Sequence, residues 1–206
     1  MRLMALGLTV LFHPTDTFIT IKRHRAQKLI AESLVFMALL LVARLSYILL
    51  LHYPVSSFDI RTTNIFLECA VHIGIIVSVA LANWNVTEIL DGEVFFRESL
   101  LGAALATLPL TIFYIPIGIV SNVMGRSENF FIRLMLGIIW CWTAFLVFRG
   151  IMVMNSYSFA KTVLICLVAV IYIAVLWCVL LMLVVFTKNL WQFVEGLITE
   201  IVVSFT

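Results

Sequence analysis

Three ionisable residues inside apolar stretches have the side chains best suited to chemistry in this sequence: Arg44, Glu68 and His72. Ionisable side chains are costly in the hydrocarbon of a bilayer, and those found there usually face other helices or water. If Arg44 and Glu68 stand on two helices joined by a short loop, both lie roughly 8 to 10 Å below the same surface. Their spacing predicts an ion pair that fixes the packing of the first two membrane helices.

His72 follows Glu68 at i+4, so it shares the same helix face and extends the polar cluster. Three interpretations stay open: a structural polar network, a pathway for protons or ions, and a metal site. A metal site is the least favoured, because Glu68 and His72 are the only local pair of ligands and the sequence contains no C-x-x-C or H-E-x-x-H motif. We expect no cofactor.

A second group of residues lies between the second and third apolar stretches, in a loop that we predict over residues 83–98 and that is rich in acidic side chains. Gly92 is expected to provide a turn with positive φ. The acidic side chains of this loop should attract the basic arm at the N-terminus. An exposed ion pair, however, contributes under about 1 kcal/mol to stability, which is a weak reason for so many charges in one loop. We therefore predict that the loop docks a cytoplasmic element of a partner, and the alternative is a membrane-surface loop with its phenylalanines in lipid. The candidate docking residues are Glu88, Asp91, Gly92, Glu93, Phe95 and Phe96.

Five apolar stretches, each long enough to cross a bilayer, must position these residues. With 64% hydrophobic and 12% charged residues, the sequence predicts an all-α, polytopic membrane protein. We expect a bundle of five transmembrane helices with an interfacial N-terminal arm and an amphipathic C-terminal helix. No separate soluble domain fits, so residues 1–206 form one domain with an arm (1–28), a bundle (29–186) and a tail (188–206). The predicted spans are 29–51, 63–82, 100–120, 130–153 and 161–186.

The third predicted span contains Pro109 and Pro116, which fall on nearly the same side of a helix. Each proline removes a backbone donor and frees the carbonyl four residues earlier. We expect two kinks in this helix. They produce either a bend needed for packing or a helix that moves or lines a cavity.

Charge and hydrophobic period predict the placement of the two ends. The arm carries five basic residues against Asp16, and positive charge is retained on the cytoplasmic side. Five crossings then put the C-terminus outside. The tail 188–206 has an apolar stripe of helical period; it is expected to lie on the outer leaflet or to fold back on the bundle, and the alternative is a partner-docking helix.

Several short motifs occur in a fixed order along most of the chain. They are His13-Pro14 with Asp16-Thr17-Phe18, Glu88-Ile89-Leu90-Asp91-Gly92-Glu93, Pro109, Ile115-Pro116, Ser121-Asn122, Tyr157-Ser158-Phe159 with Lys161, and Phe193 with Glu200-Ile201. In this order they resemble the Yip1 family of small polytopic membrane proteins, in its bacterial form with a short N-terminal arm. The sequence departs from the family at Val94, where members often have a second glycine, and at its end, where members often have a basic residue.

The resemblance implies five membrane helices with the N-terminus in the cytosol, in a bacterial cytoplasmic membrane. Eukaryotic members are similar to trafficking factors that engage small GTPases. Bacterial members look like accessory proteins, sometimes associated with ABC-type transport systems. The family offers no catalytic residues to carry over. The partners implied are the lipid bilayer and a membrane protein, with an ABC transporter as one candidate.

These observations predict a non-enzymatic integral membrane scaffold or accessory protein that modulates a membrane partner, and they are compatible with a homo-oligomer. The alternative is a small transporter or lipid-handling protein whose polar path is lined by Glu68, His72 and the third span. An enzyme is disfavoured because no complete catalytic constellation is visible. Nucleic-acid binding is disfavoured because the basic arm adjoins a membrane span.

Overall fold

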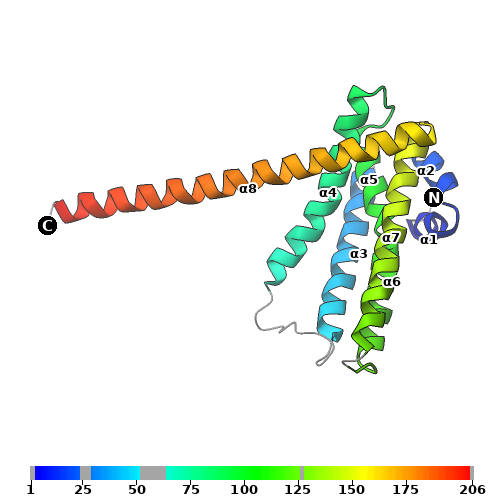
Figure 1. The fold of residues 1–206 in the computed structure, drawn as a ribbon, viewed down its shortest axis with the longest axis horizontal. Helices are drawn as coiled ribbons and strands as arrows, with labels where there is room; N and C mark the ends of the chain where they lie inside the picture. Colours follow the sequence, from blue (N-terminus) through cyan, green and yellow to red (C-terminus); the bar gives the residue numbers. More distant parts are fainter. Residues whose placement is uncertain (1–2, 24–28, 52–63, 126–127, 205–206) are drawn as a thin grey trace.

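The computed structural model describes residues 3–23, 29–51, 64–125 and 128–204, and within these ranges the regular structure is helical, with no strand (Figure 1). Five segments are long and apolar enough to cross a membrane: α3, α4, α5 and α6 as one unit, α7 and α8. The prediction of an all-α, multi-pass membrane protein is therefore confirmed. The helices are α1 (Leu3–Phe12), α2 (Pro14–Arg23), α3 (Leu29–Leu50), α4 (Ile65–Ile89), α5 (Phe96–Ala106), α6 (Leu108–Ser121), α7 (Asn129–Met154) and α8 (Phe159–Ser204).

The first and fourth predicted spans agree with α3 and α7 to within one residue at each end. The second predicted span ends too early, because α4 continues seven residues beyond 82 to Ile89. Residues 83–89 contain no glycine or proline to stop the helix. The predicted loop over 83–98 is therefore wrong in its bounds: only residues 90–95 separate α4 from α5.

The third span is divided at Thr107 into α5 and α6. Pro109 stands in the first turn of α6, so the predicted interior kink at this residue is wrong, whereas Pro116 lies inside α6. The first turn accepts proline because its N–H groups have no partner within the helix. At the break, the N–H of Thr107 donates to the carbonyl of Ala104 at 3.2 Å and its hydroxyl donates to the same oxygen at 2.7 Å.

The divided span is the centre of the bundle. Its most apolar window is 56% buried, against 39% for α3 and 28% for α4. The main contacts of α3 are with α5 and α6, α4 packs on α5, and α7 packs on both α5 and α6. The core contains Leu101, Leu105, Leu110 and Tyr114 of this span. The central span thus determines how the other helices are arranged.

The N-terminal arm packs into the bundle through α1 and α2. Phe18 is fully buried and lies over Gly150, where an added Cβ would be 3.1 Å from the ring. Arg149 donates from Nη2 to the Thr15 hydroxyl at 2.7 Å. The arm is thus held by tertiary contacts as well as by any affinity for the membrane surface.

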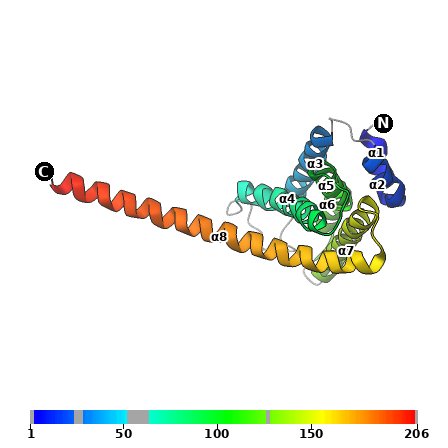
Figure 2. The same cartoon turned by 90° about the horizontal axis from the view of Figure 1, so that it is seen from above.

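The C-terminal helix α8 is a single helix of 46 residues, about 69 Å long at 1.5 Å per residue. It crosses the aligned helices near one end of the bundle and projects far beyond them (Figures 1 and 2). Its first half is anchored on α4, since Tyr172 accepts a hydrogen bond from Asn85 at 2.6 Å and Trp177 packs on Gly74. The tail is helical, as predicted, but it continues α8 instead of folding back, because no glycine or proline occurs between 159 and 195.

Candidate functional site

The pair predicted from depth is present at one end of α3 and α4. Arg44 donates from Nη2 and Nε to Oε2 of Glu68, at 3.1 and 3.3 Å. Both side chains are largely buried, so the surrounding helices shield the ion pair from solvent. A hydrogen-bonded pair of opposite charges is the arrangement in which a membrane interior tolerates ionised groups.

Two tyrosines that sequence reasoning missed complete this cluster. The Arg44 guanidinium lies 5.4 Å from the ring centroid of Tyr47 and 5.5 Å from that of Tyr114, within reach of a cation–π interaction. Tyr47 follows Arg44 at i+3, and this spacing in the sequence could have indicated that the two side chains share one helix face. Tyr114 belongs to α6, and no local pattern connects it with α3.

His72 joins the cluster through the backbone. Its Nδ1 lies 2.9 Å from the carbonyl oxygen of Glu68, and because a carbonyl only accepts, Nδ1 carries the hydrogen. The same nitrogen is 3.9 Å from Oε2 of Glu68, and the ring packs edge-on against Tyr114. Arg44, Glu68 and His72 thus form one network that joins α3, α4 and α6. Within the described ranges, no three His, Cys, Asp or Glu side chains are grouped to hold a metal ion.

The second candidate site is at the opposite end of α4, in residues 90–95, which we call the acidic loop. Asp91 has φ of 58° and Gly92 does not have positive φ, so the conformational role predicted for Gly92 is wrong. Aspartate tolerates the left-handed region better than most residues. Gly92 is needed for space, because an added Cβ would lie 2.5 Å from Thr87 Cβ and 2.8 Å from Asn155 Oδ1.

The acidic loop is fastened from three sides. The N–H of Gly92 donates to the Thr87 carbonyl at 2.6 Å, and the Tyr157 hydroxyl donates to the Leu90 carbonyl at 3.1 Å. Lys22 of the arm pairs with Glu93 at 2.5 Å, in line with the expected attraction between arm and loop. Burial, with a smaller contribution from nearby acidic side chains, raises the pKa of Tyr157, so the hydroxyl keeps its proton and continues to donate.

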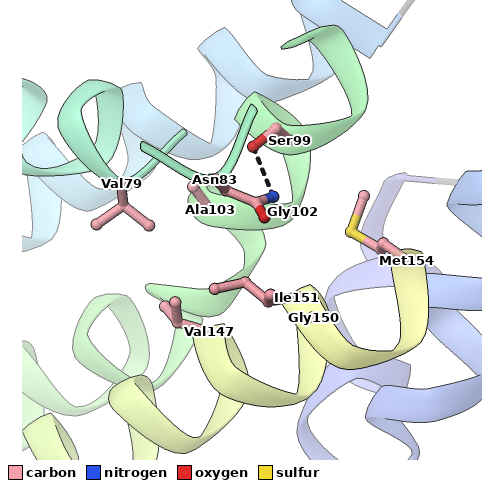
Figure 3. A pocket seen from close by; sticks show the side chains of 9 residues that line it. All are labelled: Val79, Asn83, Ser99, Gly102, Ala103, Val147, Gly150, Ile151 and Met154. Atoms are coloured by element: carbon pink, nitrogen blue, oxygen red, sulfur yellow. Dashed lines mark hydrogen bonds between the residues drawn. The ribbon is translucent and has the colours of Figure 1, made fainter. Parts of the chain in front are cut away.

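A buried polar network joins α4 to α5 next to the acidic loop. Asn83 donates to the Ser99 hydroxyl at 2.9 Å (Figure 3). Ser99 in turn donates to the Ala80 carbonyl at 2.9 Å. The Thr87 hydroxyl donates to the Asn83 carbonyl at 2.5 Å. These bonds tie the last turns of α4 to α5. Sequence reasoning placed Asn83 in a loop and gave Ser99 no role, because their partners are distant in the chain.

The predicted docking residues divide into inward and outward groups. Phe96 packs edge-on against Trp84. Glu98, the last residue of the loop predicted over residues 83–98, is buried and accepts a hydrogen bond from the Phe95 N–H at the start of α5. The outward side chains, which we call the docking surface, are Glu88, Ile89, Asp91, Glu93 and Phe95.

Comparison with known families shows that the model of the Yip1 domain matches residues 8–186. The matched range includes the intramembrane cluster and the acidic loop, and it ends before the tail. Neither the curated proteins nor the solved structures contain a match to the chain.

Proposed function

The chain belongs to the Yip1 domain family, and we propose that it is a non-enzymatic membrane scaffold whose acidic loop docks a membrane partner. The observation that carries the proposal is the rigid fastening of a loop whose own side chains point outward. Phe95 is 55% exposed and Ile89, the last residue of α4, is 82% exposed, although the backbone between them is held at the Leu90 carbonyl by Tyr157 and at the Gly92 N–H by the Thr87 carbonyl. A preordered loop loses little entropy when it binds, and this favours recognition.

The chemistry of the docking surface indicates the partner. Glu88, Asp91 and Glu93 are exposed in the same short stretch of the chain as the exposed apolar side chains of Ile89 and Phe95. A complementary surface has basic residues around an apolar pocket, since complementary charge steers association and an aromatic anchor provides affinity. A subunit of an ABC-type transport assembly that presents such a surface to the cytoplasm is the partner class we propose.

The double variant Asp91→Asn with Phe95→Ala tests the docking surface. Asparagine tolerates the positive φ of residue 91, so the loop keeps its shape and loses one charge and one aromatic anchor. We expect recovery of the co-purified membrane partner from mild detergent to fall about tenfold, the effect of a lost interface anchor. Quantitative mass spectrometry of the purified protein measures it.

The matched control is Glu128→Gln with Phe130→Ala, the same two kinds of change at the opposite end of the bundle. Both residues are exposed there, and partner recovery should equal that of the unaltered protein. If the loop variant retains its partner as well as this control does, the docking surface is not the binding site. Equal losses in both variants would also contradict the proposal.

We also propose that the arm and the acidic loop face the cytoplasm of a bacterial cell. The support is the excess of basic residues in the arm. In a variant with the native cysteines replaced, Val123→Cys should react with a membrane-impermeant maleimide in intact cells, because Val123 is exposed at the end opposite to the loop. Glu88→Cys should react only after permeabilisation. The reverse pattern would overturn the orientation.

A transporter with a polar path receives less support from the structure. A cavity that His72 borders is lined mainly by apolar side chains. Glu68 is engaged by Arg44 and does not line that cavity. The two residues therefore serve helix packing better than they serve passage of a polar solute.

A further inference from the structure

Lys22, in the last turn of α2, joins three parts of the protein through one ammonium group. Its Nζ lies 2.5 Å from Oε2 of Glu93 in the acidic loop. The same nitrogen donates to the Ser156 hydroxyl at 2.7 Å, in the turn between α7 and α8, which lies beside the arm (Figures 1 and 2). One acidic residue of the docking surface is therefore paired with a basic side chain of the same chain.

The shape of the acidic loop does not depend on this ion pair. The loop backbone is held at Leu90 by the Tyr157 hydroxyl and at Gly92 by the Thr87 carbonyl. The ammonium group meets a side-chain carboxylate, so its removal leaves both backbone bonds in place. The main effect of Lys22 on the docking surface is thus to neutralise one negative charge.

The arm is also anchored without Lys22. Phe18 is fully buried and packs on Gly150, and Arg149 donates to the Thr15 hydroxyl at 2.7 Å. These contacts hold α2 against α7. The helix therefore stays in place when the ammonium group leaves the acidic loop, and the lysine can give up its carboxylate without detachment of the arm.

The ion pair is open to replacement by another cation. The Glu93 side chain is 56% exposed, and the Lys22 side chain is 23% exposed. An exposed ion pair contributes little to stability, because water solvates both charges once they separate. A cation that makes further contacts on the docking surface can therefore displace the lysine. A partner with basic residues around an apolar pocket carries such a cation.

We propose that Lys22 is an internal competitor of the partner. Its ammonium group occupies the Glu93 carboxylate while the protein is alone, and a lysine or arginine of the partner displaces it on docking. This inference rests on the docking function proposed above and adds a regulation to it. The arm lowers the affinity of the loop for basic surfaces in general, so a partner must also bind the apolar side chains of Ile89 and Phe95 to overcome the competition.

Zero-length cross-linking tests the contact in the protein alone. A water-soluble carbodiimide joins a carboxylate and an amine that touch each other. In the full chain purified without a partner, we expect an amide between Lys22 and Glu93, identified by mass spectrometry of the peptides. With the partner bound, this link should decrease and a link between Glu93 and a partner lysine should appear. Absence of the internal link would overturn the inference and leave the docking proposal intact.

Lys22→Gln tests the competition itself. It removes the competing charge, and we expect recovery of the co-purified membrane partner to rise about threefold, the effect of one exposed ion pair. Lys22→Arg keeps a cation at this place and should recover no more partner than the unaltered protein. The matched control is Arg23→Gln, which removes the same charge from the same turn of α2 at an exposed residue and should leave recovery unchanged. An equal rise in both glutamine variants would indicate an effect of net charge and would overturn the inference.

The variant Asp91→Asn with Phe95→Ala separates this inference from the docking proposal. If that variant keeps its partner, the docking surface is not the binding site and both proposals fail. If it loses its partner while Lys22→Gln recovers no more than Arg23→Gln, docking at the loop stands and competition by Lys22 is refuted. Loss of the partner in the loop variant together with a rise in Lys22→Gln alone supports both.

Discussion

Replacing Arg44 with methionine is expected to lower the free energy of unfolding by about 2 to 3 kcal/mol, because it leaves the Glu68 carboxylate unpaired among packed helices. Methionine keeps an unbranched apolar stem in place of the arginine stem and removes the charged guanidinium group. This decrease in the free energy of unfolding is smaller than that for a fully buried ion pair, since both side chains retain some exposure to solvent. Unfolding in detergent, followed by circular dichroism against denaturant, measures the change.

A double-mutant cycle isolates the contribution of the ion pair. Glu68→Gln alone leaves Arg44 without its anion, and the combined variant should recover much of the lost stability because no uncompensated charge is left. Arg133→Met is the control, since Arg133 is exposed on α7; it should change stability by under about 0.5 kcal/mol. Strict additivity of the Arg44 and Glu68 variants would exclude an energetic coupling between the two residues.

Gly92→Ala is expected to destabilise the end of the bundle that carries the acidic loop by about 1 to 3 kcal/mol, because one added methyl group overpacks a filled space. Its Cβ would lie 2.8 Å from the backbone oxygen of Thr87, an atom that cannot rotate away. The acidic loop must then move, so contacts made by Tyr157 and Lys22 weaken. Partner recovery should fall with stability, and proteolysis within residues 90–95 should become faster.

Gly137→Ala is the matched control for this substitution. Nothing lies within 4 Å of a Cβ at Gly137, and alanine is favoured over glycine in a helix by about 1 kcal/mol. The control should therefore melt at or above the temperature of the unaltered protein. The prediction fails if the Gly92→Ala variant has the same melting temperature as this control and if its acidic loop is cut no faster by protease. That result would show that the close contacts at Gly92 are absent in solution.

The number of membrane segments follows from the amino-acid sequence alone. Each requires a long apolar run, and such runs are a property of consecutive residues. The depth of an ionisable side chain also follows from counting along a run, and for this reason Arg44 and Glu68 could be paired without a structure. The attraction between the basic arm and the acidic loop has a similar origin, and Lys22 with Glu93 is its observed form.

Element boundaries near polar residues did not follow from the sequence. Asn83 and Glu88 read as loop residues, but they belong to α4 because Ser99 of α5 satisfies the Asn83 side chain. The break at Thr107 did not follow from the sequence either, since it depends on the bonds of Thr107 to Ala104, after which α6 begins at Leu108 with Pro109 in its first turn. In both cases a hydrogen bond provided by the tertiary or local structure satisfies a polar group, so that group does not have the free-energy cost that its residue type alone would suggest.

Only the tertiary structure decided which residues share a space. Tyr114 meets Arg44 from α6, Thr143 closes on a cavity completed by α8, and Asn155 stands where a side chain at residue 92 would be. The role of Gly92 shows the physical reason. A sequence pattern reports the conformation that a residue permits, which is a local property, whereas the volume left for its Cβ depends on atoms that folding brings from a distant part of the chain.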